Sequence, residues 1–435
     1  MISSPFIFCT ILWAVILAGF YGGPFVFHPM PSADTLMLLL ACLALFVVSS
    51  VVGYAYEDRR VAPGADPPPR YVRFDVERVV AVTSVLALVG TTCIVIDRLT
   101  SQGFSDLAGL TELRYERAED LLAASEISKG VLTYCGYLLY PALYLVVAIA
   151  ICYYEGLRAR GKLLLTLNMI GPFVLAVLFG GRSPIFVLFL IIAASCVVRR
   201  LLGLRALPAG AFLKVAGIGG VLGFILYTNV IWFARLELSV STVNVLLAHA
   251  ERIWGIEPSH RFESWLAGMG KQDLMVPLLG AWFYFFQGPS IFERLTSAGG
   301  YPVLFGGYHI DIVAAGFRLF PETRTMLADG YASLLKSNVY GFFPTAWGSL
   351  LIDFSFGAFP LIALWGAVCG TTYARLRRYG RPGDAIYYVF LFYSIMIGPI
   401  SAPFGLANSF VTFLYFLGFK LWLTSTGKTR NANST

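Results

Sequence analysis

Charged residues are scarce in this sequence: they make up 13% of its 435 residues, whereas hydrophobic residues make up 57%. The mean hydropathy is +0.73. A soluble fold is excluded, because the apolar residues come in long uninterrupted blocks that a soluble core of this size could not bury. We therefore expect an integral membrane protein.

Cysteine and histidine are also few, with 7 and 4 copies. The cysteines lie inside apolar blocks without the Cys-x-x-Cys spacing of zinc and redox sites, so we expect neither disulfides nor zinc. The sequence has no P-loop, no Gly-x-Ser-x-Gly elbow and no His-Glu-x-x-His motif. Its predicted external loops lack the Asp-x-Asp that would hold a metal-bound nucleotide sugar. We expect no metal and no cofactor.

What the sequence does contain is a series of apolar blocks long enough to cross a membrane. A helix needs roughly 20 apolar residues to cross about 30 Å of hydrocarbon, because its backbone polar groups must be satisfied within the segment. Ten such spans are predicted, and the sixth and ninth are short. They lie near 5–25, 35–55, 79–97, 131–153, 163–180, 184–198, 212–234, 356–374, 385–400 and 403–423.

Basic residues gather in alternate loops between these spans, which the positive-inside rule places in the cytoplasm. The net charge of +7 is thus a topology signal, and no nucleic-acid partner is expected. The basic loops contain Arg59, Arg60, Arg70 and Arg73, then Arg158, Arg160 and Lys162, then Arg199, Arg200 and Arg205, then Arg375, Arg377, Arg378 and Arg381, and finally Lys428 and Arg430.

This charge pattern predicts an all-α transmembrane bundle with both termini in the cytoplasm. Residues 1–234 would form an N-terminal bundle of about seven spans with an external loop at 98–130. Residues 235–355 would form a large extracytoplasmic loop, and 356–435 the last spans and a cytoplasmic tail. Within the large loop, 274–292 is apolar but broken by Pro and Gly, which favours a re-entrant segment.

Two further segments of the large loop have expected structures. If 274–292 paired with 303–320 as a hairpin, the span count would rise from ten to twelve without changing the orientation of the termini. Stretch 240–256 places apolar and polar residues on separate helical faces, as a helix lying on the bilayer surface would.

Arg182 is the sharpest candidate for a functional residue. It stands in Gly180-Gly-Arg-Ser-Pro184, between two apolar spans at the external boundary. A planar guanidinium binds oxyanions through two parallel donors, and the neighbouring glycines let a ligand approach the backbone, so a diphosphate would fit. The alternative is an ordinary interfacial arginine whose stem lies in lipid while its head group reaches water.

Other external polar residues form a weaker set. Arg235, Arg252 and Arg261 suggest an anion site together, although nearby glutamates could instead pair with each of them. Asp353 lies in an apolar stretch and needs a partner or water. The candidates for a general base are Asp353, Glu251 and His309. The polar run before the eighth span contains Lys336, Asn338 and Tyr340.

Part of this run resembles a known family. Asn338-Val-Tyr-Gly-Phe-Phe343 and Asp353-Phe-Ser-Phe-Gly357 are similar to the Asn-x-Tyr-Thr-Phe and Asp-Phe-Gly motifs of the O-antigen (oligosaccharide repeat-unit) polymerases. Tyr284-Phe-Phe-Gln-Gly-Pro289 and the Gly-Gly-Arg182-Ser turn also resemble signatures of that family. Gly341 replaces the usual Thr, and Ser355-Phe356 interrupts the Asp-Phe-Gly motif.

The resemblance implies a bacterial inner-membrane glycosyltransferase with a fold like that of the GT-C polymerases and ligases. On the external face, it would polymerise polyprenyl-diphosphate-linked oligosaccharide repeat units into O-antigen, capsule or exopolysaccharide. Its partners would be these substrates, membrane lipid and, as an open alternative, a chain-length regulator. An O-antigen ligase and a flippase for the same lipids stay open. The site residues expected are Arg182, Arg235, Asp353 and His309 for catalysis, and Arg252, Arg261, Tyr284, Lys336, Asn338 and Tyr340 for substrate binding.

Overall fold

The computed structural model describes residues 3–60, 74–102, 130–178, 181–208, 247–248, 250–271, 274–299 and 303–432. The first half of the chain forms α1 (Pro5–Gly22), β1 (Phe25–Phe27), α2 (Ala33–Arg59), α3 (Val76–Gln102), α5 (Val131–Leu139), α6 (Ala142–Cys152), the 3-10 turn η1 (Tyr154–Gly156), α7 (Ala159–Leu178) and α8 (Ser183–Leu201).

The second half begins with a π-helical turn, η2 (Ala250–Trp254), and β2 (Ile256–Pro258). The helices that follow are α11 (His260–Gly268), α12 (Met275–Phe286), α13 (Gly288–Ser297), α14 (Asp311–Phe317), α15 (Pro321–Lys336), α16 (Thr345–Phe354), η4 (Ser355–Gly357), α17 (Ala358–Tyr379), α18 (Pro382–Ile397) and α19 (Ser409–Ala432).

Seven helical segments of the described residues are long and apolar enough to cross a membrane. They are 5–22, 33–59, 76–100, 131–152, 159–178, 183–201 and 345–379, and two shorter apolar helices cover 382–397 and 409–425. The prediction of an all-α membrane helix bundle is confirmed. The predicted span at 212–234 lies outside the described residues, so the count of ten to twelve spans stays a prediction.

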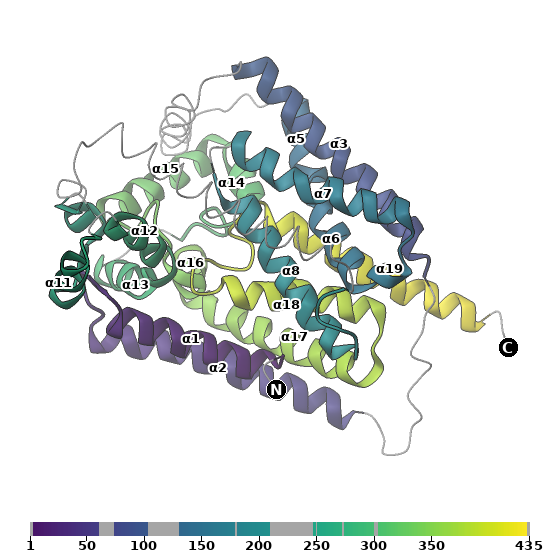
Figure 1. Ribbon diagram of the computed structural model, residues 1–435, viewed down its shortest axis with the longest axis horizontal. Helices are drawn as coiled ribbons and strands as arrows, with labels where there is room; N and C mark the ends of the chain where they lie inside the picture. The colour runs from purple at the N-terminus through teal and green to yellow at the C-terminus, as the bar shows by residue number, and fades with distance from the viewer. Residues whose placement is uncertain are drawn as a thin grey trace.

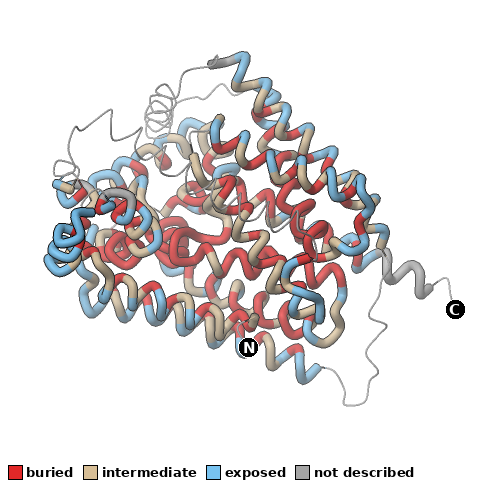
Figure 2. The backbone as a smooth tube through the Cα atoms, in the orientation of Figure 1, coloured by how far each residue is buried: buried red, intermediate tan, exposed pale blue. Residues whose placement is uncertain are grey.

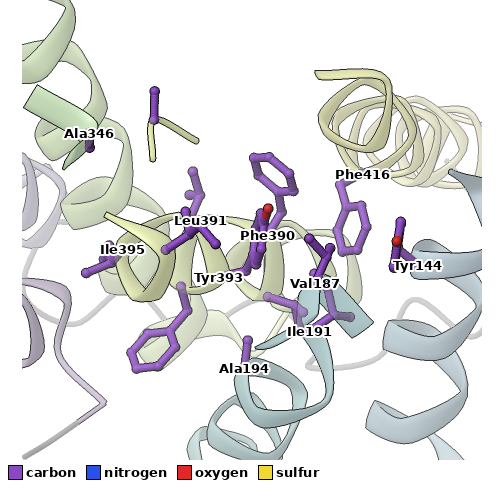
Figure 3. Close-up of a cluster of buried hydrophobic side chains, with 14 of the residues drawn as sticks. Tyr144, Val187, Ile191, Ala194, Ala346, Phe390, Leu391, Tyr393, Ile395 and Phe416 are labelled. Carbon is purple, nitrogen blue, oxygen red and sulfur yellow. The ribbon is translucent and has the colours of Figure 1, made fainter. Parts of the chain in front are cut away.

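The centre of the bundle is formed by α6 and α18, which are buried along nearly their whole length (Figure 2). Figure 3 shows buried side chains from α6, α8, α18 and α19 there, among them Tyr144, Ile191, Phe390 and Phe416. The outward residues of α2 are exposed but apolar: Met37, Leu40, Val48, Val51 and Val52. Such a surface is stable in contact with lipid and would be unfavourable in water, which fits a helix bundle that lies in a membrane.

The tightest helix pair is α2 with α17, which run side by side in the same direction (Figure 1). Their backbones touch at glycines. A Cβ atom on Gly366 would overlap the carbonyl oxygen of Phe46, and one on Gly370 would overlap the carbonyl oxygen of Ser50. Glycines four residues apart permit this close approach, as is common between membrane helices.

One end of the bundle collects the basic segments, and we call it the basic end. Arg375 of α17 forms an ion pair with Glu57 of α2 at 2.9 Å. Lys420 of α19 pairs with Asp384 of α18 at 3.1 Å. The N-terminus lies here too, because the Tyr388 hydroxyl of α18 donates to the carbonyl of Ser3 at 2.8 Å.

The remaining basic loops join the same end. Phe74, just before α3, packs its ring against Phe419 of α19 and Tyr153 beyond α6. The backbone N–H of Arg158 donates to the Glu77 side chain of α3 at 3.1 Å. The described parts of the basic loops that the sequence assigned to one side of the membrane are therefore gathered at one end of the structure. Which side of the membrane this end faces stays a prediction.

The opposite end carries a cap, which we define as described residues 247–344 together with β1. Phe27 of β1 pairs with Ile256 of β2 in an antiparallel two-stranded sheet. A small apolar cluster joins these strands to α1, α11 and α12. The cap corresponds to the described part of the loop predicted at 235–355, and it lies beside the ends of α1 and α2 at the left in Figure 1.

Two segments of the cap differ from their predicted structures. Stretch 303–320 is not one apolar helix but a loop followed by the seven-residue α14, because Phe305 and Gly306 have positive φ angles. Seven helical residues span about 10 Å, far short of a bilayer. Stretch 240–256 does not stay helical to its predicted end, because a π-helical turn ends at Trp254 and Gly255 at φ +65° leads into β2; residues 240–246 lie outside the described residues. The predicted break in 274–292 is confirmed, since α12 ends before Gln287 and Pro289 lies in the first turn of α13.

The glycine contact between α2 and α17 predicts a large effect of one methyl group. Gly370→Ala should lower the free energy of unfolding by about 1–3 kcal/mol, because the added Cβ separates the two backbones. Thermal unfolding of the detergent-purified protein would show this as a lower midpoint. Gly418→Ala in α19 is the control: a Cβ there would have no neighbouring atom within 4 Å, so the midpoint should stay the same or rise. Equal midpoints for both variants would contradict the packing argument.

The positive-inside rule predicts that the basic end faces the cytoplasm. Two exposed glycines with open space around them test this without altering charge: Gly156 at the basic end and Gly268 in the cap. In a background without native cysteines, Gly268→Cys should react with a membrane-impermeant maleimide in spheroplasts. Gly156→Cys should react only after the cells are permeabilised. The reverse pattern would invert the orientation.

Candidate functional site

The structure brings together Arg182 and Tyr284, two residues from distant parts of the sequence. Arg182 is the N-cap residue of α8, and Pro184 in the first turn fixes the start of that helix. Its guanidinium carbon lies 4.3 Å from the centre of the Tyr284 ring of α12, and Nη2 donates to the Tyr284 hydroxyl. Gly180, predicted to shape the turn, lies outside the described residues.

Tyr284 holds the guanidinium of Arg182 without neutralising its charge. Cation–π stacking and a phenol oxygen orient the group, whereas a carboxylate would have cancelled it. Tyr284 in turn packs against Phe343 at 5.8 Å between ring centres. A half-buried arginine held in this way can bind an oxyanion with its remaining N–H donors.

Asp353 and His309 form a second pair, and it is deeply buried. Asp353 ends α16 with no exposed surface, and His309 is 5% exposed. The Asp353 carboxylate accepts hydrogen bonds from the backbone N–H of Tyr308 at 2.9 Å and of His309 at 3.2 Å, and it contacts Nδ1 of His309. Asp353 therefore has its partners already, and its role is to hold the 304–309 loop and orient the imidazole.

His309 keeps one nitrogen for other chemistry. Its Nε2 is buried and has no hydrogen-bond partner among the described residues. The ring stacks on Phe404, with centres 6.4 Å apart and planes 11° from parallel, and Phe354 packs edge-on at 6.2 Å. When Nδ1–H donates to the carboxylate, Nε2 is a proton acceptor, the same arrangement that orients a histidine base in hydrolases.

The charged members of the remaining predicted set lie on the surface wherever the structure describes them. Arg235 lies outside the described residues. Arg252 in the π-helical turn and Arg261 in the first turn of α11 are exposed, as are the base candidate Glu251 and Lys336 at the end of α15. Their exposure fits a solvated surface, which is the alternative that the sequence leaves open.

Asn338 and Tyr340 occupy a sharp bend after α15. Asn338 has φ +52°, and its carbonyl oxygen accepts from Nη1 of Arg294 at 3.3 Å. The Tyr340 ring lies 5.0 Å from that of Tyr331. Burial raises the pKa of the Tyr340 phenol, and the positive charge of Arg318 opposes that rise. Asn338 therefore shapes the chain, whereas Tyr340 lies beside a cation.

Sequence reasoning missed both arginines that meet this bend. Nη2 of Arg294 donates to the carbonyls of His28 and Trp254, each at 2.9 Å, so Arg294 ties α13 to the turn after β1 and to η2. Burial lowers the pKa of Arg294. The sequence signal for Arg318 is a lone cation in Ala315-Gly-Phe-Arg-Leu-Phe320, inside the stretch considered as a possible span.

Comparison with known proteins finds no family model, no curated protein and no solved structure that matches this chain. The fold and the site define a multi-pass membrane helix bundle with a cap of short helices that carries buried polar residues. The resemblance to the O-antigen polymerases thus stays a prediction, based on the quoted motifs.

Asp353 supplies a prediction about the cap. Asp353→Ala leaves the N–H groups of Tyr308 and His309 buried without acceptors, at a cost of about 1–3 kcal/mol for each group. Thermal unfolding in detergent should show a clearly lower midpoint than for the wild type. Asp329→Ala removes an exposed carboxylate of α15 and should leave the midpoint unchanged. A wild-type midpoint for Asp353→Ala would show that this carboxylate does not hold the loop.

Proposed function

We propose that this protein is a membrane glycosyltransferase that polymerises polyprenyl-diphosphate-linked oligosaccharides on the outer side of the bacterial inner membrane. The observation that carries the proposal is Arg182, a cation at the start of α8 that Tyr284 orients and does not neutralise. The quoted family motifs support it as well, since Tyr284 and Arg182 come from two of the segments that resemble polymerase signatures.

The chemistry needs a cation where Arg182 stands. In the transfer, the bond between the anomeric carbon of the donor glycan and its diphosphate oxygen breaks, and a new bond forms from that carbon to a hydroxyl oxygen of the acceptor sugar. Polyprenyl diphosphate leaves with the electron pair, and the hydroxyl proton passes to a base. Negative charge therefore grows on the leaving diphosphate, where the donors of Arg182 would stabilise it.

His309 is the better of the predicted bases. The oxygens of Asp353 are engaged with the 304–309 loop, whereas Nε2 of His309 is an acceptor with no partner among the described residues. The hydroxyl proton would go to Nε2, and the Asp353 carboxylate would stabilise the imidazolium that forms. Asp353 is then a positioning residue.

The arrangement of the bundle suits a lipid substrate. Arg182 lies at the start of α8, a helix long enough to cross a membrane, and Tyr284 lies on the apolar α12 of the cap. Both residues are therefore near the boundary between the bundle and the cap. A diphosphate at this level would keep its polyprenyl chain in the bilayer. Its sugars would extend toward the cap.

Deletion of the gene tests the function, with surface glycan analysed on a gel. A polymerase deletion leaves glycan of a single repeat unit attached at the surface. Loss of all attached glycan would indicate a ligase, and internal accumulation of lipid-linked precursor would indicate a flippase. Either of the last two outcomes overturns the polymerase proposal.

Arg182 gives the sharpest prediction about activity. Arg182→Ala should reduce turnover by about 10²–10³, because a contact that strengthens as charge develops on the leaving group is lost. Arg182→Lys should recover little, since an ammonium lacks the planar pair of donors. The measurement is glycan length in a deletion strain complemented with each variant at equal protein level. Arg200→Ala, at an exposed arginine of the basic end, is the control and should give full-length glycan. Full-length glycan from Arg182→Ala would remove Arg182 from the site.

A further inference from the structure

Arg318 is half-buried, and one edge of its guanidinium differs from those of Arg199 and Arg294. It lies between α14 and α15, and its Nε and Nη2 atoms are both buried without a hydrogen-bond partner among the described residues. These two atoms form the edge of the guanidinium whose parallel N–H bonds fit the two oxygens of a carboxylate or phosphate. Buried N–H donors without acceptors cost stability, so this edge is not there for stability.

Arg199 is the contrasting case. It is fully buried, and each of its nitrogens has an acceptor: Nε donates to the carbonyl of Arg205 at 2.8 Å, Nη1 to that of Ile151 at 2.7 Å, and the Glu155 carboxylate accepts from both terminal nitrogens. Such an arginine ties the ends of α6 and α8 together. Arg318 has no comparable set of acceptors among the described residues.

Two tyrosines lie near enough to Arg318 for its charge to act on their phenols. Tyr331 and Tyr340 pack with ring centres 5.0 Å apart, and the Tyr331 hydroxyl donates to the carbonyl of Gly307 at 2.7 Å. Burial raises the pKa of both phenols, and the charge of Arg318 opposes the rise in each case. The phenols therefore stay protonated beside the cation, and the Tyr340 hydroxyl can serve as a neutral donor to an anion.

The segment 340–343 connects the surroundings of Arg318 to those of Arg182. Tyr340 packs on Tyr331, whereas Phe343 packs at 5.8 Å on Tyr284, the residue that carries the Arg182 guanidinium. The Cα atoms of residues 340 and 343 are at most about 11 Å apart along an extended chain. Arg182 and Arg318 thus both lie near residues of one short segment of the cap.

We propose that Arg318, with Tyr340 beside it, forms a second oxyanion subsite that binds a phosphate or carboxylate of a ligand in the cap. The site itself follows from the buried donor edge. Its occupant rests on the proposed function: a polymerase must hold two lipid diphosphates at once, a donor and an acceptor, and Arg182 accounts for one of them.

Stability of the purified protein without added ligand gives the first test. Replacing an arginine that holds the structure together destabilises the fold, but Arg318→Met should raise the thermal midpoint or leave it unchanged, because two buried donors without acceptors are removed. Arg199→Met is the comparison and should lower the midpoint strongly. A strong loss for Arg318→Met as well would overturn the subsite, since it would show that the guanidinium holds the cap together.

Binding of inorganic pyrophosphate and of glucuronate gives the second test, by calorimetry in detergent. The Arg182→Gln protein should still bind one of these anions, and adding Arg318→Gln should weaken that binding at least about tenfold. Adding Arg200→Gln instead should change nothing. Pyrophosphate binding supports a diphosphate ligand, and glucuronate binding alone supports an acidic sugar; both support the subsite.

Two results separate the subsite from the polymerase proposal. Equal anion binding with and without Arg318→Gln, or no anion binding by the Arg182→Gln protein, would overturn the subsite. A deletion strain with normal polymer would overturn the polymerase but leave the binding result standing. In that case Arg318 would be an oxyanion site of a membrane protein with another activity.

Discussion

The cap keeps its shape because one buried carboxylate at the end of α16 anchors it. Asp353 accepts hydrogen bonds from two successive backbone N–H groups of the 304–309 loop and from the His309 ring, and its own carbonyl accepts from Phe305 at 2.8 Å. Because α16 continues through η4 into α17, this places the loop on the membrane bundle itself. Tyr331 then docks on the loop through Gly307, which positions α15 and the bend that follows it.

The wholly or partly buried arginines of the described chain fall into two groups according to their partners. Arg199 and Arg294 donate to backbone carbonyls and join segments that would otherwise end with unsatisfied oxygens. Arg182 contacts a tyrosine ring and hydroxyl, and the inner edge of Arg318 has no acceptor among the described residues. A cation whose charge is oriented but not cancelled is a poor stabiliser and a good receptor for an anion.

The bundle and the cap follow different physical rules. In the bundle, glycine contacts such as Gly366 and Gly370 bring helices together, and the outward faces stay apolar because lipid surrounds them. In the cap, the chain turns sharply at Gly255, Phe305 and Asn338, where φ is positive. Side chains there form hydrogen bonds with backbone groups that no helix or strand pairs. A site at the boundary can therefore hold a lipid tail on one side and a polar head group on the other.

The sequence by itself determined the membrane helices, since an apolar block of about 20 residues has one stable arrangement in a bilayer and its basic flanks mark one end. It also indicated Arg182, Asp353 and His309, because polar residues are conspicuous among apolar ones, and it indicated Tyr284 through the family resemblance. It could not pair them, and it suggested a span at 303–320, since apolar composition does not reveal a positive φ at Phe305. Tertiary structure alone decided that Asp353 is bound to the loop, that Arg252 and Arg261 are exposed, and that the donors of Arg318 have no acceptor among the described residues. Such outcomes depend on contacts between residues tens to hundreds of positions apart, which no local pattern contains.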